Sequence, residues 1–204
     1  MPRISDARER LLEAASELVW LESYGSTSVD DICERAGVKK GSFYHFFVSK
    51  SELVAAALRE VWEKEKKPSL DEAFSASIPP VERLTRFMAN GRRKHEEMSA
   101  RHGRILGCPL YTLGSEISTQ DAELRALIEE ILATHTRYLT SAIRDGMAEG
   151  AINPADPARQ AQAAFALIEG ALARARIQNS LDPLEGLNDH VLRLIGVINP
   201  PPVS

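Results

Sequence analysis

The segment AGVKKGSFYHFFVSK, residues 36–50, gathers side chains suited to binding a negatively charged partner. It contains no acidic residue, although the whole chain carries a net charge of −4. Its basic residues are Lys39, Lys40 and Lys50. Ammonium groups attract phosphate oxygens, and the polar tips of Tyr44 and His45 can donate hydrogen bonds. The segment is therefore either a surface for an anionic partner or a solvated basic face above a core.

No pattern in the sequence favours an enzyme. The chain lacks the G-x-S-x-G, P-loop, H-E-x-x-H and dinucleotide-binding motifs. Its histidines do not pair with acidic residues at metal-ligand spacing, and two cysteines, Cys33 and Cys108, cannot form a disulfide framework. We therefore expect no catalytic activity, no cofactor and no metal.

Helical patterns surround the basic segment. Apolar residues recur at helical spacing over residues 5–22, and Ser28 with Asp31 forms a capping-box pattern before a short helix at 29–35. Gly37 suits the left-handed conformation of a tight turn between helices. The pattern predicts two short helices joined by this turn.

The second of these helices is predicted over residues 39–46, and its two faces differ. Its apolar face carries Phe43 and Phe46, followed by Phe47. The outer positions are Lys40, Ser42, Tyr44 and His45. A helix, a short turn with glycine and a second helix form the helix-turn-helix arrangement, whose second helix enters the major groove of DNA.

Residues 24–54, YGSTSVDDICERAGVKKGSFYHFFVSKSELV, resemble the TetR/AcrR family of bacterial transcriptional regulators. The shared order is Gly before Ser/Thr, an Asp-Ile pair, Ala-Gly-Val, Gly-Ser/Thr, Tyr-His-Phe-Phe aromatics and Ser-Lys. The resemblance implies an all-α fold of about nine helices. An N-terminal three-helix helix-turn-helix DNA-binding domain would be joined to a larger helical domain for ligand binding and dimerisation.

The resemblance also implies a set of DNA contacts. Ser28 would bind a phosphate, and Lys50 would anchor the DNA backbone from the start of the fourth helix. Gly41 would let the backbone approach the base edges closely, and Lys39 would add phosphate attraction where the family often has a small residue. The implied DNA-binding residues are Ser28, Lys39, Lys40, Gly41, Ser42, Tyr44, His45 and Lys50.

We expect three regions along the chain. Residues 1–50 form the DNA-binding domain, 51–67 a connecting helix, and 68–204 the ligand-binding and dimerisation domain. The stretch PSLDEAFSASIPP marks the joint, and Pro80 can begin the next helix. A long amphipathic helix is predicted over residues 121–149. Two last helices are expected to start at the pairs Asp156-Pro157 and Asp182-Pro183.

The resemblance implies a homodimer through the last two helices and a small organic ligand in the second domain. We therefore expect a repressor that binds an inverted-repeat DNA operator and is released from it by the ligand. One alternative is a DNA-associated interaction protein without an effector, in which the second domain is closed and dry. A second alternative is an electrophile or redox sensor that acts through Cys108.

The second domain offers candidate ligand contacts that combine apolar walls with polar tips. These are Phe87, Cys108, Tyr111, Glu116, His135, Tyr138, Phe165 and Glu169. The aromatic members can equally be ordinary core residues. The segment GCPLYTLGSE resembles a TetR-type subgroup, some members of which sense electrophiles or oxidants through the cysteine. Cys108 can also be a small packed residue.

The apolar segments are too short for a membrane. No uncharged apolar run approaches about 18 residues, and MPRISDARER lacks the apolar stretch of a signal peptide. With 44% hydrophobic residues, the chain can still bury a core. We expect a cytoplasmic protein with no membrane partner.

Overall fold

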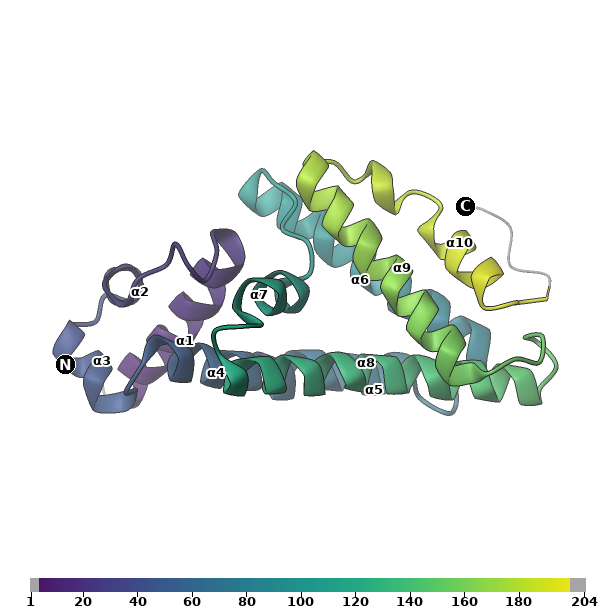
Figure 1. Ribbon diagram of the computed structural model, residues 1–204, viewed down its shortest axis with the longest axis horizontal. Coiled ribbons are helices and arrows are strands. Elements are labelled where there is room, and N and C mark those ends of the chain that lie inside the picture. Colours follow the sequence, from purple (N-terminus) through teal and green to yellow (C-terminus); the bar gives the residue numbers. More distant parts are fainter. Residues whose placement is uncertain (1–3, 199–204) are drawn as a thin grey trace. The chain divides into compact units, whose positions relative to one another are not determined.

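A computed structural model describes residues 4–198, in which every regular element is a helix (Figure 1). The predicted domain ends at residues 1–3 and 199–204 lie outside the described part. The α-helices are α1 (Ile4–Leu21), α2 (Val29–Ala36), α3 (Lys40–Phe46), α4 (Lys50–Val61), α5 (Lys67–Ala73), α6 (Pro80–His102), α7 (Pro109–Ile117), α8 (Ala122–Ala148), α9 (Pro157–Gln178) and α10 (Leu187–Leu194). A π-turn, η1 (Trp62–Lys66), and a 3-10 turn, η2 (Asp182–Leu184), complete the elements. The predicted all-α class is confirmed.

The described residues form two compact units. The first contains residues 4–67 and Pro109–Glu130, and the second contains Pro68–Cys108 and residues 131–198. The division differs from the sequence-based one at residues 109–130, which pack with the helix-turn-helix. Leu113 and Ile117 of α7 are buried there, a placement that local sequence patterns do not encode.

The helix-turn-helix is built as its capping pattern predicts. Ser28 and Asp31 form the capping box at the start of α2, and Gly37 ends that helix in the left-handed conformation at φ +61°. Leu11, Ile32 and Phe43 are fully buried in the core of this unit. Because these residues come from α1, α2 and α3, the core fixes the short helices against one another.

The helical backbone continues past the predicted joint near Lys67. The π-turn η1 follows α4 directly and leads into α5, so the chain remains helical through Ala73. The stretch PSLDEAFSASIPP, which begins with Pro68, predicts a joint at this point. Pro68 lies instead inside this continuous helical stretch, directly after η1, where the Lys67 N–H bonds to the carbonyl of Trp62 five residues earlier. The expected helix end near Lys67 is therefore wrong.

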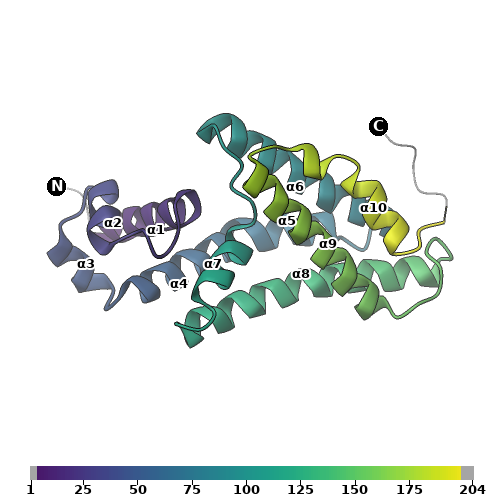
Figure 2. The same ribbon diagram turned by 45° about the horizontal axis from the view of Figure 1, so that its top comes forward.

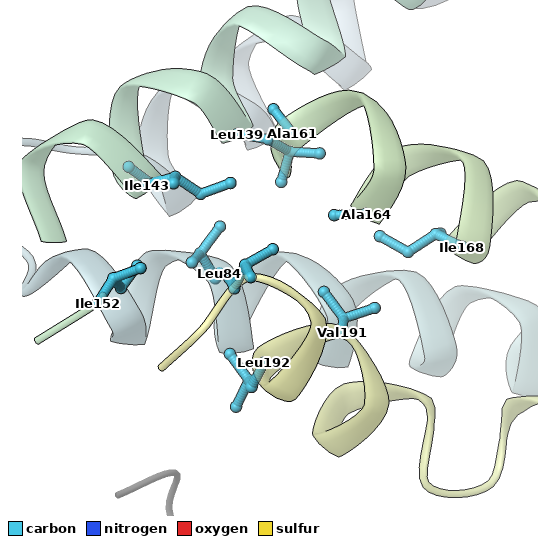
Figure 3. Packing of buried hydrophobic residues seen from close by; sticks show 11 residues of the cluster. Leu84, Leu139, Ile143, Ile152, Ala161, Ala164, Ile168, Val191 and Leu192 are labelled. Carbon is cyan, nitrogen blue, oxygen red and sulfur yellow. The ribbon is translucent and has the colours of Figure 1, made fainter. Parts of the chain in front are cut away.

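The core of the second unit lies among α6, α9, α10 and the second half of α8 (Figure 3). Its fully buried members include Leu84, Leu139 and Ile143. At one side of this core, Arg83 of α6 is buried and its Nη1 lies 2.7 Å from Oδ2 of Asp145. A buried guanidinium needs such a partner, because an unpaired charge in this environment is costly.

The last helices lie side by side in Figure 2. Asp156 caps α9 and Pro157 occupies its first turn, as predicted. The pair Asp182-Pro183 instead begins η2, and α10 starts only at Leu187 because Gly186 turns the chain at φ +65°. Within the described residues, no helix has the length and apolar character needed to cross a membrane.

Candidate nucleic-acid interface and ligand pocket

Helix α3 buries one face and exposes the other. Phe43 is 0% exposed and Phe47 is 4% exposed, whereas Tyr44 is 55% exposed. The rings of Phe43 and Tyr44 meet edge to face at 5.0 Å between centroids. Lys39, Lys40, Gly41 and His45 are also exposed, and Ser42 and Phe46 are half-buried. The predicted division of this segment into a core face and an outward polar face is therefore present.

Gly41 has no packing role within the described residues. A Cβ added to it would meet no heavy atom within 4 Å. Glycine within a helix costs roughly 0.5–1 kcal/mol relative to alanine. Because α3 does not need glycine for its own packing, the open space in front of Gly41 is available for close approach by another surface.

The two lysines at the start of α3 have different surroundings. Nζ of Lys40 lies 2.8 Å from Oδ1 of Asp30, and this hydrogen-bonded carboxylate raises the pKa of Lys40. The exposed side chain of Lys39 forms no ion pair in the described part of the chain. Positive charge at a helix N-terminus opposes the helix dipole, so these lysines do not favour α3 itself. They suit an external anion instead.

Lys50 and Glu116 hold the same loop, residues 24–27, inside the first unit. Nζ of Lys50 donates to the carbonyls of Tyr24 and Thr27 at 2.7 and 2.8 Å, and it lies 4.0 Å from the centre of the Tyr24 ring. Burial lowers the pKa of Lys50. The Glu116 carboxylate accepts hydrogen bonds from the backbone N–H of Tyr24 and Gly25 at 3.0 and 2.6 Å.

Ser28 directly follows this loop and is exposed. Its Oγ donates to Oδ2 of Asp31 at 2.6 Å and accepts from the Asp31 N–H at 3.1 Å. The hydrogen bonds that the hydroxyl and the backbone N–H of Ser28 donate to the Asp31 carboxylate lower the pKa of Asp31. Ser28 and Lys50 thus have internal structural roles, and their contacts with DNA stay predictions.

The second unit contains a pocket of about 360 Å³. It is lined by Phe74, Arg83, Thr134, Arg137, Tyr138, Ser141 and Ala142. Five of these residues come from one stripe of α8, and the other two come from the end of the α5 segment and from α6. Tyr138 donates its hydroxyl hydrogen to Oδ1 of Asp71, and burial raises the pKa of Tyr138 to about 12. Its hydroxyl is therefore protonated at neutral pH.

A row of aromatic rings runs beside the pocket through α6, α8 and α9. Phe74 lies 5.3 Å from Tyr138 and 5.6 Å from Phe87, measured between ring centroids. His135 lies 6.4 Å from Phe87 and stacks on Phe165 at 5.8 Å. The structure thus brings four predicted ligand residues together, but only Tyr138 among them lines the pocket.

Comparison with known proteins identifies the family. Residues 11–57 match "Bacterial regulatory proteins, tetR family", and residues 80–191 match "Tetracyclin repressor-like, C-terminal domain". The transcriptional regulator AcuR of Cereibacter sphaeroides is 35% identical over 90% of this chain and 82% of its own. The chain belongs to the TetR family of transcriptional regulators.

Other TetR-family proteins match along nearly the whole chain. The transcriptional repressor NemR of Escherichia coli K12 is 26% identical, covering 93% of this chain and 94% of NemR. The crystal structure of its reduced form superposes with a TM-score of 0.80, covering 96% of this chain and 100% of that one. A regulatory protein TetR from Rhodobacter sphaeroides, 33% identical, also gives a TM-score of 0.80 and covers 92% of this chain and 98% of that one. The predicted family is confirmed.

Three further predicted ligand residues of this TetR-family protein lie outside the pocket lining. Tyr111 is 45% exposed on α7 of the first unit, and Glu116 of the same helix binds the loop described above. Cys108 is half-buried immediately before α7. Sequence reasoning missed two lining residues, Phe74 and Arg83. Phe74 lies beyond the expected end of the connecting helix, and an arginine such as Arg83 is usually found at the surface.

Glu169 of α9 is the buried carboxyl of the second unit. It is 4% exposed, and its Oε2 has no hydrogen-bond partner among residues 4–198. The carboxyl group as a whole is hydrogen-bonded to the Cys108 side chain. Burial raises the pKa of Glu169 from 4.5 to about 7, because the charged form loses its water. The Cys108 hydrogen bond acts in the opposite direction and is the smaller effect.

This raised pKa makes the free energy of unfolding depend on pH. The folded-state pKa exceeds the unfolded one, so the stability contribution is full below about pH 4.5 and is lost as the pH rises through about 7. Replacing Glu169 with Gln removes this loss. We predict that the stability of Glu169→Gln relative to the wild type rises by up to about 3 kcal/mol between pH 5 and 8. Chemical denaturation across this pH range measures it.

The exposed Glu149, just after α8, supplies the control for this experiment. Glu149→Gln should leave the pH dependence of unfolding as it is in the wild type. Parallel pH profiles for Glu169→Gln and the wild type would contradict the assignment of a titrating, buried carboxyl.

Proposed function

We propose that this protein is a homodimeric repressor that binds an inverted-repeat operator and leaves it when a small organic molecule occupies the pocket. The carrying observation is the two-faced helix α3, in which Phe43 is buried and Tyr44 and His45 are exposed. Repression is also the activity named for NemR, a relative that matches nearly the full chain.

We assign the DNA contacts in two groups. The phosphate-binding group lies at the starts of α2 and α3 and consists of Ser28, Lys39 and Lys40. Lys40 would leave its ion pair with Asp30 to bind a DNA phosphate. Ser42, Tyr44 and His45 would face base edges in the major groove, which specify sequence. Lys50 would act mainly by holding the loop that precedes Ser28, with its remaining N–H available for a phosphate.

The proposed dimer uses the outer faces of α9 and α10. Large apolar side chains are exposed there, namely Leu167 and Ile177 of α9, Leu194 of α10 and Ile198 shortly after α10. Ile177 is 82% exposed, and a Cβ added to Gly170 would meet no atom within 4 Å. Burial of such apolar surface is the main favourable term in association. A second copy of the same helices supplies a matching surface by two-fold symmetry.

The pocket supports release by an effector over a DNA-associated protein without one. Its volume, about 360 Å³, lies in the range of small-molecule sites, and hydroxyl and guanidinium groups converge on it. A coupling free energy of about 1–3 kcal/mol between effector and operator would change DNA affinity by about 5- to 150-fold. In the alternative without an effector, the second domain would be closed, and we would expect apolar residues at these positions.

Gly41→Ala tests the DNA-binding face. An added methyl group would occupy the space in front of α3, so we predict at least about tenfold weaker binding to DNA from upstream of the protein's own gene. The free energy of unfolding should stay the same or rise by up to about 1 kcal/mol, since alanine favours the helix. Fluorescence anisotropy and chemical denaturation measure the two quantities.

The matched control is Gly91→Ala in α6, where an added Cβ also meets open space. It should change stability similarly and leave DNA binding unaltered. Wild-type DNA affinity in Gly41→Ala would rule out close approach of DNA at this position.

Ile177→Asp tests the dimer. A charge within the proposed apolar interface would be desolvated without a partner, so the variant should be monomeric at micromolar concentration. The wild type should sediment as a dimer under the same conditions, and circular dichroism should show equal helix content. A monomeric wild type, or a dimeric Ile177→Asp protein, would contradict the interface.

A second candidate function is electrophile sensing by Cys108. The observation that favours it is the hydrogen bond between the half-buried thiol and Glu169, whose pKa of about 7 suits a group that accepts the thiol proton. Loss of the proton would give the thiolate that attacks an electrophile.

N-ethylmaleimide distinguishes the two candidates. If Cys108 senses electrophiles, alkylation will abolish operator binding of the wild type and of Cys33→Ser, and Cys108→Ser will be resistant. Cys33 is the control because it is buried and its pKa is raised by that burial. If the repressor is released only by a pocket ligand, alkylated wild type and Cys108→Ser will both keep their operator affinity.

A further inference from the structure

The wall of the pocket formed by α8 is unusually polar. Its lining residues, at positions 134, 137, 138, 141 and 142, share one helical face, and only Ala142 is apolar. A helix normally turns an apolar stripe toward the interior of its domain. The polar stripe of α8 instead borders the open side of the pocket, where Arg137 is exposed and Thr134, Tyr138 and Ser141 are half-buried, so its donors are accessible to a ligand.

Arg83 forms the opposite wall and is held rigidly. Its side chain is 7% exposed, and its Nε and Nη2 donate to the carbonyls of Ile78 and Ala76 at 2.7 and 3.2 Å. Its Nη1 donates to Asp145 at 2.7 Å. A guanidinium has five N–H donors, so two remain beyond these three bonds. The fixed group is therefore pre-organised to donate to a ligand in the pocket.

Arg137 adds a positive charge that no carboxylate balances within the described residues. Its Nη2 donates to Oγ1 of Thr134 at 2.6 Å, and it forms no ion pair there. The nearby carboxylates are already engaged, since Asp145 pairs with Arg83 and Asp71 accepts from Tyr138. The residues that line the pocket thus include two arginines and no carboxylate.

We propose that the pocket binds an organic anion, whose carboxylate or phosphate group is held by Arg137 and Arg83 and whose body packs against Phe74. Guanidinium groups bind these head groups through paired hydrogen bonds, and an aromatic wall favours a flat apolar body. This inference rests on the proposed effector site and names its ligand class. A volume of about 360 Å³ suits a ligand of one ring or a short chain.

The test uses four probes of similar shape and different charge: benzoate, phenyl phosphate, benzamide and benzylamine. Isothermal titration of the full chain without DNA should show benzoate or phenyl phosphate binding about tenfold more tightly than neutral benzamide, with benzylamine weakest. The stronger of the two anions identifies the head group.

Arg137→Gln should lose about tenfold affinity for that anion and keep its affinity for benzamide, because only the charge-assisted bonds are removed. Arg125→Gln is the control, since Arg125 is an exposed arginine of the same helix outside the pocket lining. It should bind every probe as the wild type does.

Equal or tighter binding of benzamide or benzylamine, unchanged anion affinity in Arg137→Gln, or no saturable binding of any probe would overturn the inference. Release of operator DNA is measured separately. Anion binding through Arg137 that leaves DNA affinity unchanged would uphold the ligand class and contradict the proposed release. Release by an unrelated compound, without anion binding, would uphold the repressor and reject the anion site.

Discussion

The burial of Phe43 beneath α3 is the constraint on which the DNA-binding surface depends. Helix α3 has seven residues, and a helix this short is unstable in isolation. Phe43 and Phe47 hold it against the core formed with Leu11 and Ile32. The buried side chains on the inner face of α3 therefore fix the direction in which its outer residues point.

A second layer of control comes from the loop before α2. Lys50 donates to its carbonyl groups, Glu116 accepts from its N–H groups, and Ser28 caps α2 immediately afterwards. Hydrogen bonds between peptide groups and charged side chains are stronger than hydrogen bonds between neutral groups. The start of α2 is thus set by α4 and α7 together, and not by the capping box alone.

Much of this arrangement was predictable because it follows from local chemistry. The capping box at Ser28, the left-handed Gly37 and the inner position of Phe43 each depend on residues within one turn or one helix. The partners of Lys50 and Glu116 were not predictable, since they are 23 to 26 and 91 to 92 residues away in sequence. From the sequence alone, Lys50 is a candidate DNA contact and Glu116 a candidate ligand contact. Only tertiary packing shows that both bind the loop before α2.

The pocket shows the same limit. The sequence located its region through the aromatic residues of α6, α8 and α9, which do cluster, but the residues lining the pocket are mostly polar. Phe74 was missed because the proline- and serine-containing stretch after Lys67 suggested a joint, although the chain stays helical through Ala73. A periodicity argument selects apolar stripes as core, so it cannot single out a stripe of Thr134, Arg137 and Ser141 as the wall of a binding site.

Selection of bound sequences from a random double-stranded DNA library, with the purified full chain, tests the central claim most directly. A symmetric pair of α3 helices should enrich an inverted repeat whose half-site centres lie about 34–36 Å apart, or a multiple of this distance. Enrichment of a single, non-repeated site, or no enrichment above the starting library, would contradict the account of a dimeric, sequence-reading repressor.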